Sequence, residues 1–257
     1  MSDQERQALT YQGAMTGLFD DFFDKQDMPD MLLKTLIEKP DELPGNNSSE
    51  KLFLSFYKKA LQHAHDPSST LQYLRKVYEA QVESKRQAIK GSLNASEILR
   101  ITIQKGGVSV LFYRTVLSNP LNKEEKEALY QMGGLMQLGN DIFDVYKDCQ
   151  GKIDTPATTA TKISEVRKLF QTQMEKSFSL FFKTSYSHKN IKRFLRLISM
   201  SLCSRCFVCL DQLEEKERTS NNVFTPHQYN RKDLICDMQK TSNKWKTIKY
   251  FGSTTPG

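Results

Sequence analysis

The stretch that decides the fold runs from Glu124 to Lys147 and reads EEKEALYQMGGLMQLGNDIFDVYK. Its large apolar side chains recur at intervals of three and four residues, a spacing that gathers them on one side of an α-helix. These positions are Leu129, Met132, Leu135, Met136, Ile142, Phe143 and Tyr146. The pattern predicts a long amphipathic helix with its apolar side in a core.

The same spacing continues in both directions from this stretch, between breaks that contain glycine or proline. No segment shows the sustained alternation with β-branched residues that predicts a strand. The sequence therefore predicts an all-α fold. The expected helices cover residues 5–26, 28–38, 49–64, 68–90, 94–117, 123–149, 161–185, 188–216 and 228–248.

The chain has 257 residues, which is enough for one large domain with a substantial core. We expect a single helical domain over residues 1–250 and a disordered tail over residues 251–257. No apolar run is long enough to span a bilayer, and the first residues lack the basic and apolar pattern of a secretory signal. These features favour a soluble, cytoplasmic protein without stable membrane insertion.

Charge is distributed unevenly along the chain. Residues 1–50 carry eleven acidic and four basic side chains, so a net charge of −7 there leaves +14 for the rest of a chain whose total is +7. A basic surface suits nucleic acid, an anionic membrane surface or a phosphorylated small molecule, and charge alone does not choose among them. Because the chain lacks an arginine-rich tract and interleaved aromatic and basic residues, we expect no nucleic-acid partner.

The first acidic motif is Asp20-Asp21-Phe22-Phe23-Asp24, inside an expected helix. Asp20 and Asp24 are one helical turn apart, so their carboxylates share a face and repel each other unless a cation lies between them. Mg²⁺ is usually held by one or two carboxylates, with phosphate oxygens completing its coordination shell. A solvated acidic face explains this motif, taken alone, about as well as a metal site.

The second motif is QLGNDIFDVYKD, residues 137–148. Asn140, Asp144 and Asp148 occupy positions i, i+4 and i+8, which places three oxygen ligands along one stripe of a helix. Lys147 adjoins this stripe and either meets a phosphate or interacts with the end of the helix. Two carboxylate stripes about 120 residues apart fit one site that holds metal ions and a diphosphate.

Together, the motifs resemble the aspartate-rich motif and the second metal motif of class I isoprenoid synthases. This superfamily includes prenyltransferases, squalene and phytoene synthases, and class I terpene cyclases. The pattern Gln-x-x-Asn-Asp-Ile-x-Asp is similar to that of prenyltransferases, whereas Asn140, Asp144 and Asp148 fall where terpene cyclases carry Asn, Ser or Thr, and Glu. From Thr16 to about Lys240 the chain resembles bacterial class 1 isoprenoid biosynthesis enzymes.

The resemblance implies an isoprenoid-synthase-type helical bundle around a central apolar cavity, with the two motifs across its mouth. It implies three Mg²⁺ ions as cofactors, two on the first motif and one on the second. The implied ligands are Asp20, Asp21, Asp24, Asn140, Asp144 and Asp148, and all of them except Asp21 are also expected to be catalytic. The metal ions would neutralise the charge that grows on a departing diphosphate.

Basic residues expected to bind the diphosphate come from three places in the sequence. Arg100 and Lys105 precede the second motif, near positions where the superfamily carries a diphosphate-sensing arginine and a diphosphate-contacting lysine. Lys147 lies inside the second motif. Arg231 lies about where cyclases keep an Arg-Tyr pair, here in reversed order.

The leading hypothesis is a class I terpene synthase that ionises a linear prenyl diphosphate, cyclises the carbocation and releases diphosphate. Its substrate would be geranyl, farnesyl or geranylgeranyl diphosphate. The paired arginines that follow the first motif of prenyltransferases are absent after Asp24, which argues against chain elongation. A prenyl-coupling transferase of the same superfamily is the alternative enzyme.

The first motif begins at residue 20, whereas the family places several helices before it. The resemblance therefore implies an incomplete bundle, which a homodimer could complete. From a different class, the chain could be a non-catalytic relic of the fold that binds prenyl lipid or protein.

Three cysteines at steps of three residues form a competing motif. Cys203, Cys206 and Cys209 lie in an expected apolar helix, without the loop spacing and fourth ligand of an iron–sulfur site. We therefore expect reduced thiols packed in a core.

Overall fold

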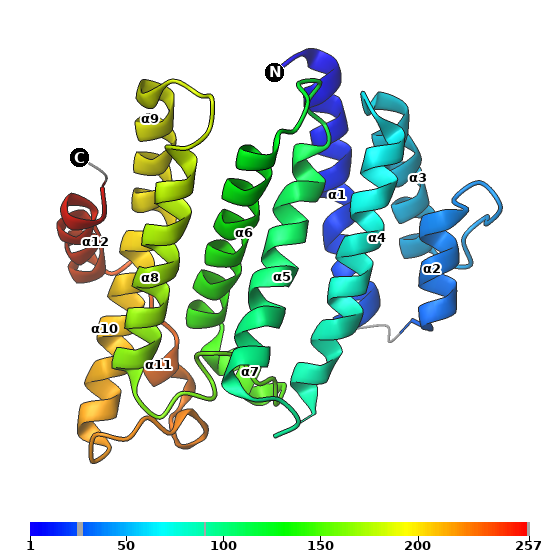
Figure 1. The fold of residues 1–257 in the computed structure, drawn as a ribbon. Coiled ribbons are helices and arrows are strands. Elements are labelled where there is room, and N and C mark those ends of the chain that lie inside the picture. The colour runs from blue at the N-terminus through cyan, green and yellow to red at the C-terminus, as the bar shows by residue number, and fades with distance from the viewer. Residues whose placement is uncertain (25–27, 90, 256–257) are drawn as a thin grey trace. The chain divides into compact units, whose positions relative to one another are not determined.

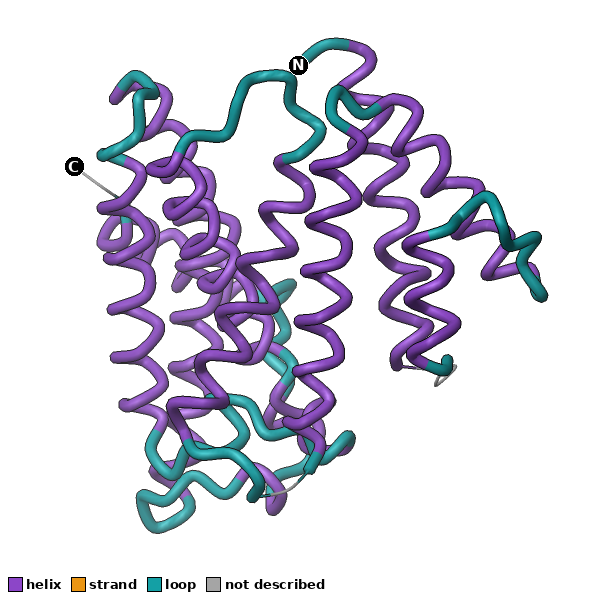
Figure 2. The backbone as a smooth tube through the Cα atoms, turned by 45° about the vertical axis from the view of Figure 1, so that its right-hand side comes forward, coloured by secondary structure: helices purple, strands orange, loops and turns teal. Residues whose placement is uncertain are grey.

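The computed structural model of the chain describes residues 1–24, 28–89 and 91–255, and the side chain of Asp24 lies outside this description. Within these ranges the chain forms helices and loops, and no strand (Figures 1 and 2). The predicted all-α class is confirmed for this part of the chain. Residues 25, 26 and 90, at the ends of two expected helices, lie outside the described ranges.

The helices form two compact units, which we describe separately. The first unit comprises Met1–Val82 and Val108–Leu121, and the second comprises Glu83–Gly107 and Asn122–Gly257. The expectation of a single domain over residues 1–250 stays a prediction.

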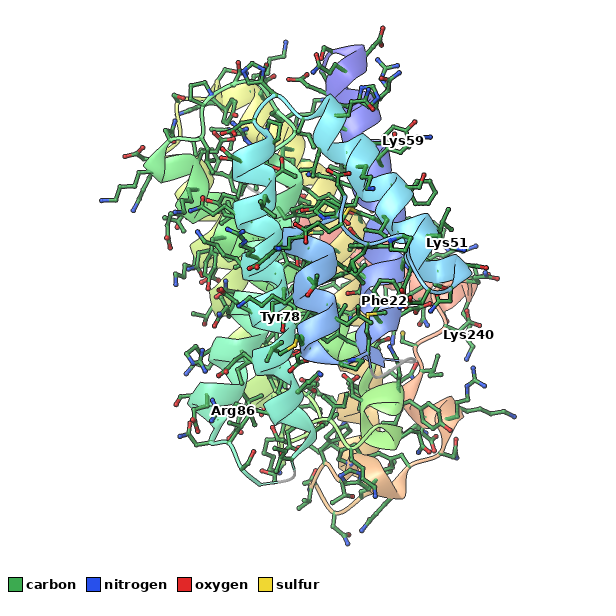
Figure 3. All side chains as sticks on the ribbon, turned by 90° about the vertical axis from the view of Figure 1, so that its right-hand side faces the viewer. Phe22, Lys51, Lys59, Tyr78, Arg86 and Lys240 are labelled. Atoms are coloured by element: carbon green, nitrogen blue, oxygen red, sulfur yellow. The ribbon has the colours of Figure 1, made fainter. Side chains whose placement is uncertain are left out.

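The first unit contains three complete helices, most of a fourth and the end of a fifth. They are α1 (Asp3–Asp24), α2 (Asp30–Glu38), α3 (Ser48–His63), α4 (Pro67–Ser84) and the C-terminal part of α5 (Ala95–Arg114). α1 and α3 pack along each other through aromatic rings, with Phe53 stacked on Phe19 and meeting the edge of Phe22. Lys51 and Lys59 of α3 are exposed (Figure 3). α3 therefore buries an aromatic side against α1 and keeps these two lysines in solvent.

The second unit contains the remaining elements. They are η1 (Lys85–Ala88, a 3₁₀ turn), the N-terminal part of α5, α6 (Lys123–Phe143), α7 (Val145–Gln150), α8 (Ile163–Phe181), α9 (His188–Ile198), η2 (Ser199–Cys203, a π-helical turn), α10 (Ser204–Thr219), η3 (Pro226–Gln228, a 3₁₀ turn), α11 (Arg231–Leu234) and α12 (Thr241–Thr254). α6 runs beside α8, and α10 beside α12 (Figure 1). Asn122 caps α6, since its side chain accepts a hydrogen bond from the Glu125 amide. Most of the apolar side predicted for α6 lies in the core of this unit, with Met132, Leu135 and Ile142 buried there. Met136 is 46% exposed, so the prediction was wrong at that position.

Two of the expected helices are interrupted by a residue that is not helical. The helix expected over residues 123–149 is divided at Asp144, whose φ of −94° and ψ of 12° end α6 and begin α7. The helix expected over residues 228–248 is interrupted between α11 and α12, because Ile235 is extended. Gln212 of α10 donates to the carbonyls of Asp233 and Ile235, so a tertiary contact replaces the helical bonds there.

The end of the chain also differs from the expectation. α12 continues to Thr254, whereas a disordered tail was expected from residue 251. The Ser199 hydroxyl donates to the carbonyl oxygen of Thr254 over 3.0 Å, and the side chain of Thr254 is buried. These contacts fasten the last turn of α12 to η2.

The five cysteines are all free and buried. Burial raises the pKa of Cys203 to about 12, and burial also raises the pKa of Cys206 well above its ordinary value. Cys209 packs in the same core and donates its thiol to the carbonyl oxygen of Ile142. The predicted core thiols are confirmed.

Candidate functional site

Paired glycines bring α5 and α6 into backbone contact within the second unit. A Cβ atom on Gly106 would overlap the carbonyl oxygen of Gly133, and one on Gly134 would lie 2.7 Å from Cδ1 of Ile103. Only hydrogen fits at these positions, so the two helices approach more closely than ordinary side chains allow. Thr102 and Lys105 of α5 are thereby brought to the second motif on α6.

Asp141 is anchored at this contact. It is 4% exposed, and each of its carboxylate oxygens accepts a hydrogen bond, from Thr102 Oγ1 at 3.1 Å and from Gln137 Nε2 at 3.0 Å. Burial raises the pKa of Asp141 to about 6, while the two hydrogen bonds and the charge of Lys105 act in the opposite direction. Asp141 is therefore a buried and firmly positioned carboxylate.

The three expected ligands of the second motif lie on both sides of Asp141, with Asn140 just before it and Asp144 and Asp148 after it. Asn140 Nδ2 donates to Asp144 Oδ2 over 3.3 Å. The amide of Asp144 donates to the carbonyl of Asn140, and that of Asp148 to the carbonyl of Asp144, each over 2.8 Å. The one-turn spacing of Asn140, Asp144 and Asp148 is thus kept across the break between α6 and α7.

Asp148 is half-buried at the start of α7, close to the other carboxylates. Burial, and then the negative charges of Asp141 and Asp144, raise the pKa of Asp148 to about 7. Lys147 and Lys105 lower it by a smaller amount. The site therefore holds three mutually repelling carboxylates, and we call Asp141, Asp144 and Asp148 the carboxylate cluster.

The sequence interpretation did not single out Asp141. Its spacing of three residues from Asp144 and seven from Asp148 places it on the same side of a helix, and this was a usable signal. Thr102 and Gln137 were also missed. Gln137 is one turn before Asp141, but only the tertiary contact of α5 with α6 identifies Thr102 as its partner.

The first motif lies on α1, in the first unit. Asp20 is half-buried and accepts a hydrogen bond from Gln81 Nε2 of α4 at 2.8 Å. Asp21 is also half-buried, and Asp24 is the last residue of α1. The expected metal role of the Asp24 side chain falls outside the described residues.

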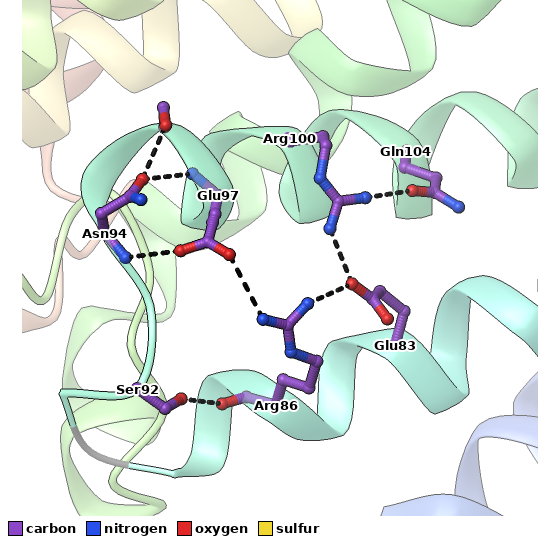
Figure 4. A network of polar contacts seen from close by, with 8 residues as sticks. Glu83, Arg86, Ser92, Asn94, Glu97, Arg100 and Gln104 are labelled. Carbon is purple, nitrogen blue, oxygen red and sulfur yellow. Dashed lines mark hydrogen bonds and ion pairs between the residues drawn. The ribbon is translucent and has the colours of Figure 1, made fainter.

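Arg100, an expected diphosphate ligand, is held in a network of ion pairs on the surface of the second unit. Its guanidinium donates to Glu83 Oε1 at 2.6 Å and to Gln104 Oε1 at 2.9 Å. Arg86 bridges the same Glu83 to Glu97 (Figure 4). In this arrangement Arg100 serves the contact between the end of α4 and α5, and it would have to release Glu83 to bind a diphosphate.

The other expected basic residues lie near the second motif in different ways. Lys105 is half-buried and, together with exposed Lys147, acts electrostatically on Asp148. Arg231 is the first residue of α11, which Asn230 caps and which packs against α7. The segment that carries Arg231 is therefore brought to the helix that carries Asp148.

Several pockets open in the described parts of the units. One of about 300 Å³ follows the second motif and is lined by Cys149, Lys152, Ile153, Asp154, Thr158 and His227. A second pocket, also in the second unit, has a volume of about 380 Å³, and its lining includes Ala95 and Leu169. A third, of about 430 Å³, lies in the first unit, and its lining includes Arg114. None of the six expected metal ligands lines these three pockets, so the central apolar cavity stays a prediction.

In the residues that the structure describes, no three His, Cys, Asp or Glu side chains converge as a complete metal site. Also within these residues, no helix is both long and apolar enough to cross a membrane. The chain matches no family model, no curated protein and no solved structure.

Proposed function

We propose that the chain is a class I terpene synthase, which ionises a linear prenyl diphosphate with Mg²⁺ and allows the carbocation to cyclise. The observation that carries this proposal is the carboxylate cluster on α6 and α7, with Asn140 at its edge and Lys105 beside it. The all-α class is compatible with this proposal.

The donor set suits Mg²⁺. This hard cation prefers oxygen ligands and usually keeps room for water and phosphate oxygens, so a few partly exposed carboxylates are sufficient. Asp144 and Asp148 are half-buried and reachable, whereas Asp141 has both oxygens engaged by Thr102 and Gln137. We assign metal binding to Asp144 and Asp148, with the amide oxygen of Asn140, and a positioning role to Asp141.

Repulsion within the cluster favours a bound cation. The negative charges of Asp141 and Asp144 contribute to the raised pKa of Asp148, and a nearby positive charge would offset this repulsion. When bound, Mg²⁺ supplies charge that stabilises a departing diphosphate. Lys105 and Lys147 would contact phosphate oxygens as additional cations.

The role proposed for the first motif rests on its sequence. Asp20, Asp21 and Asp24 retain the metal role that the resemblance implies, and Asp20→Asn tests it separately from the second motif. Because Asp20 also accepts a hydrogen bond from Gln81, the free energy of unfolding of this variant should be measured alongside its activity.

The direct test is incubation of the chain with geranyl, farnesyl or geranylgeranyl diphosphate, with and without Mg²⁺. We expect Mg²⁺-dependent release of diphosphate and formation of a cyclic hydrocarbon. Asp144→Asn and Asp148→Asn should each reduce the rate about 10²–10³-fold, the usual effect of removing an electrostatic stabiliser. Glu124→Gln, an exposed change in the first turn of α6, is the matched control and should leave the rate unchanged.

Other outcomes would identify the alternatives. A requirement for a second prenyl diphosphate, with a longer linear product, would indicate a prenyl-coupling transferase. Binding of prenyl diphosphates without any release would indicate a non-catalytic relic, and it would contradict the proposed activity.

A further inference from the structure

The outer side of α12 carries large apolar residues in an exposed position. Trp245 is 68% exposed and Ile248, one turn further along the helix, is 53% exposed. The opposite side of the helix contains Thr247 and Thr254, both buried, and Tyr250, whose ring stacks on Phe207 of α10. α12 is therefore well packed on one side, while a tryptophan and an isoleucine face solvent on the other.

α9 and η2 present a similar surface. Leu197 is 63% exposed and Met200 is 38% exposed, although Ile191 and Leu195 of the same helix are buried. Arg193 and Arg196 are exposed on this outer side as well. Apolar and basic side chains are thus mixed on a surface that does not take part in the core of the unit.

These two surfaces belong to neighbouring elements of one unit. α12 packs against α10 and η2. Figure 1 shows α12 beside α10. The hydrogen bond from Ser199 to Thr254 joins η2 to the end of α12. We call nine of the exposed side chains on these elements the basic apolar face. It consists of Lys189, Arg193, Arg196, Leu197, Met200, Lys244, Trp245, Ile248 and Lys249.

The charge of this region is uniform in sign. Residues 188–203 contain four lysines and arginines, residues 240–254 contain four lysines, and neither segment contains an aspartate or glutamate. On the supporting helix α10, Asp211 and Glu214 are both bound by Arg167, which compensates one of their two negative charges. Lys244 and Lys249 flank the stripe of Trp245 and Ile248 on the two sides of α12.

We propose that the basic apolar face docks on the surface of a lipid bilayer that carries anionic headgroups. Exposed apolar side chains enter the boundary between headgroups and acyl chains, and surrounding lysines and arginines are attracted to anionic lipid. Tryptophan is favoured at this boundary because its ring is amphipathic. The docking is peripheral, and it does not depend on the activity proposed above.

The single tryptophan of the chain makes the test direct, because all of the tryptophan fluorescence comes from Trp245. The full chain is mixed with vesicles of phosphatidylcholine alone or of phosphatidylcholine with phosphatidylglycerol. We expect the emission to move to shorter wavelength with the anionic vesicles only. Phosphatidylcholine brominated in its acyl chains, included in the anionic vesicles, should quench it.

Two variants separate the apolar and the charged contributions in a vesicle sedimentation assay. Ile248→Gln with Leu197→Gln should lower binding to anionic vesicles about tenfold, since two insertable side chains are removed. Lys244→Glu with Lys249→Glu should lower it more than tenfold and weaken its dependence on salt. Lys34→Glu with Lys126→Glu, which reverses two exposed lysines elsewhere, is the matched control and should bind like the unmodified chain.

Four results would overturn the proposal. The first is unchanged Trp245 emission with anionic vesicles, and the second is equal binding to neutral and anionic vesicles. The third is a dimer in sedimentation equilibrium that Ile248→Gln with Leu197→Gln converts to a monomer, which would make the face an interface between two copies. The fourth is tighter binding to a random-sequence DNA duplex than to the vesicles, which would assign the charge to nucleic acid.

Discussion

The hydroxyl of Thr102 donates a hydrogen bond to the carboxylate of Asp141 over 3.1 Å and ties α5 to α6 at the carboxylate cluster. Gln137 of α6 donates a hydrogen bond to the other carboxylate oxygen, so side chains of both α5 and α6 hold Asp141 in place. A buried carboxylate in this position helps to orient the residues around it. Its neighbours Asn140 and Asp144 are the ones that the proposed function needs.

Thr102→Val removes this hydrogen bond with little change in shape. Because Asp141 would then be buried with one partner fewer, we expect the free energy of unfolding to fall by about 1–2 kcal/mol. Urea denaturation at neutral pH measures the change. Thr10→Val removes an exposed hydrogen bond to the carbonyl of Arg6 and should have less than half of this effect. Equal losses of unfolding free energy in both variants would show that the hydrogen bond to Asp141 stabilises the fold no more than an exposed one.

Asp148→Asn is expected to alter the pH dependence of stability in a buffer that contains a metal chelator. The pKa of Asp148 is about 7 in the folded chain and close to its ordinary value of about 4 in the unfolded chain. Between these values the folded chain binds more protons, so its stability falls as pH rises, and the loss is complete above about pH 7.

The asparagine variant lacks this titration. It should match the unmodified chain near pH 4 and exceed it by about 1–2 kcal/mol near pH 8, after allowance for the partial exposure of Asp148. Thermal unfolding at a series of pH values measures the difference. A variant that is less stable than the unmodified chain at pH 8 and equal to it at pH 4 would reverse the predicted sign.

Gly106→Ala tests the close approach of α5 and α6. The added methyl group would overlap the backbone of Gly133, so we expect a loss of about 3 kcal/mol in the free energy of unfolding. Gly13→Ala is the matched control. A Cβ atom there meets nothing within 4 Å, and alanine should stabilise α1 by about 0.5–1 kcal/mol. Similar values for the two variants would contradict the backbone contact.

Most of the helices could be predicted because their apolar side chains follow the helical period. The prediction for residues 228–248 was wrong between α11 and α12, where Gln212 satisfies the carbonyls of Asp233 and Ile235 from another helix. That contact joins residues distant in the sequence and leaves no periodic signal. The break at Asp144 also leaves no signal in the periodicity. The backbone hydrogen bonds on both sides of Asp144 keep the helical spacing across it.

The candidate site could be located from the sequence but not completed. The spacing of Asn140, Asp144 and Asp148 identified the second motif. Asp141, three residues before Asp144 and seven before Asp148, lies on the same side of a helix and was missed. The role of Arg100 depends on Glu83, seventeen residues earlier, and only the packing of α4 and α5 brings the two together. The double glycines at residues 106–107 and 133–134 are typical of close helix packing. The sequence does not show which helix packs against each pair, because that depends on the tertiary structure.

Binding of Mg²⁺ with inorganic diphosphate, measured as a rise in melting temperature, tests the central claim most directly, because it requires no turnover. The unmodified chain and Glu124→Gln should be stabilised by the two together more than by either alone, whereas Asp144→Asn and Asp148→Asn should lose most of that gain. Equal stabilisation of all four chains, or none in the unmodified chain, would contradict a metal-diphosphate site on α6 and α7.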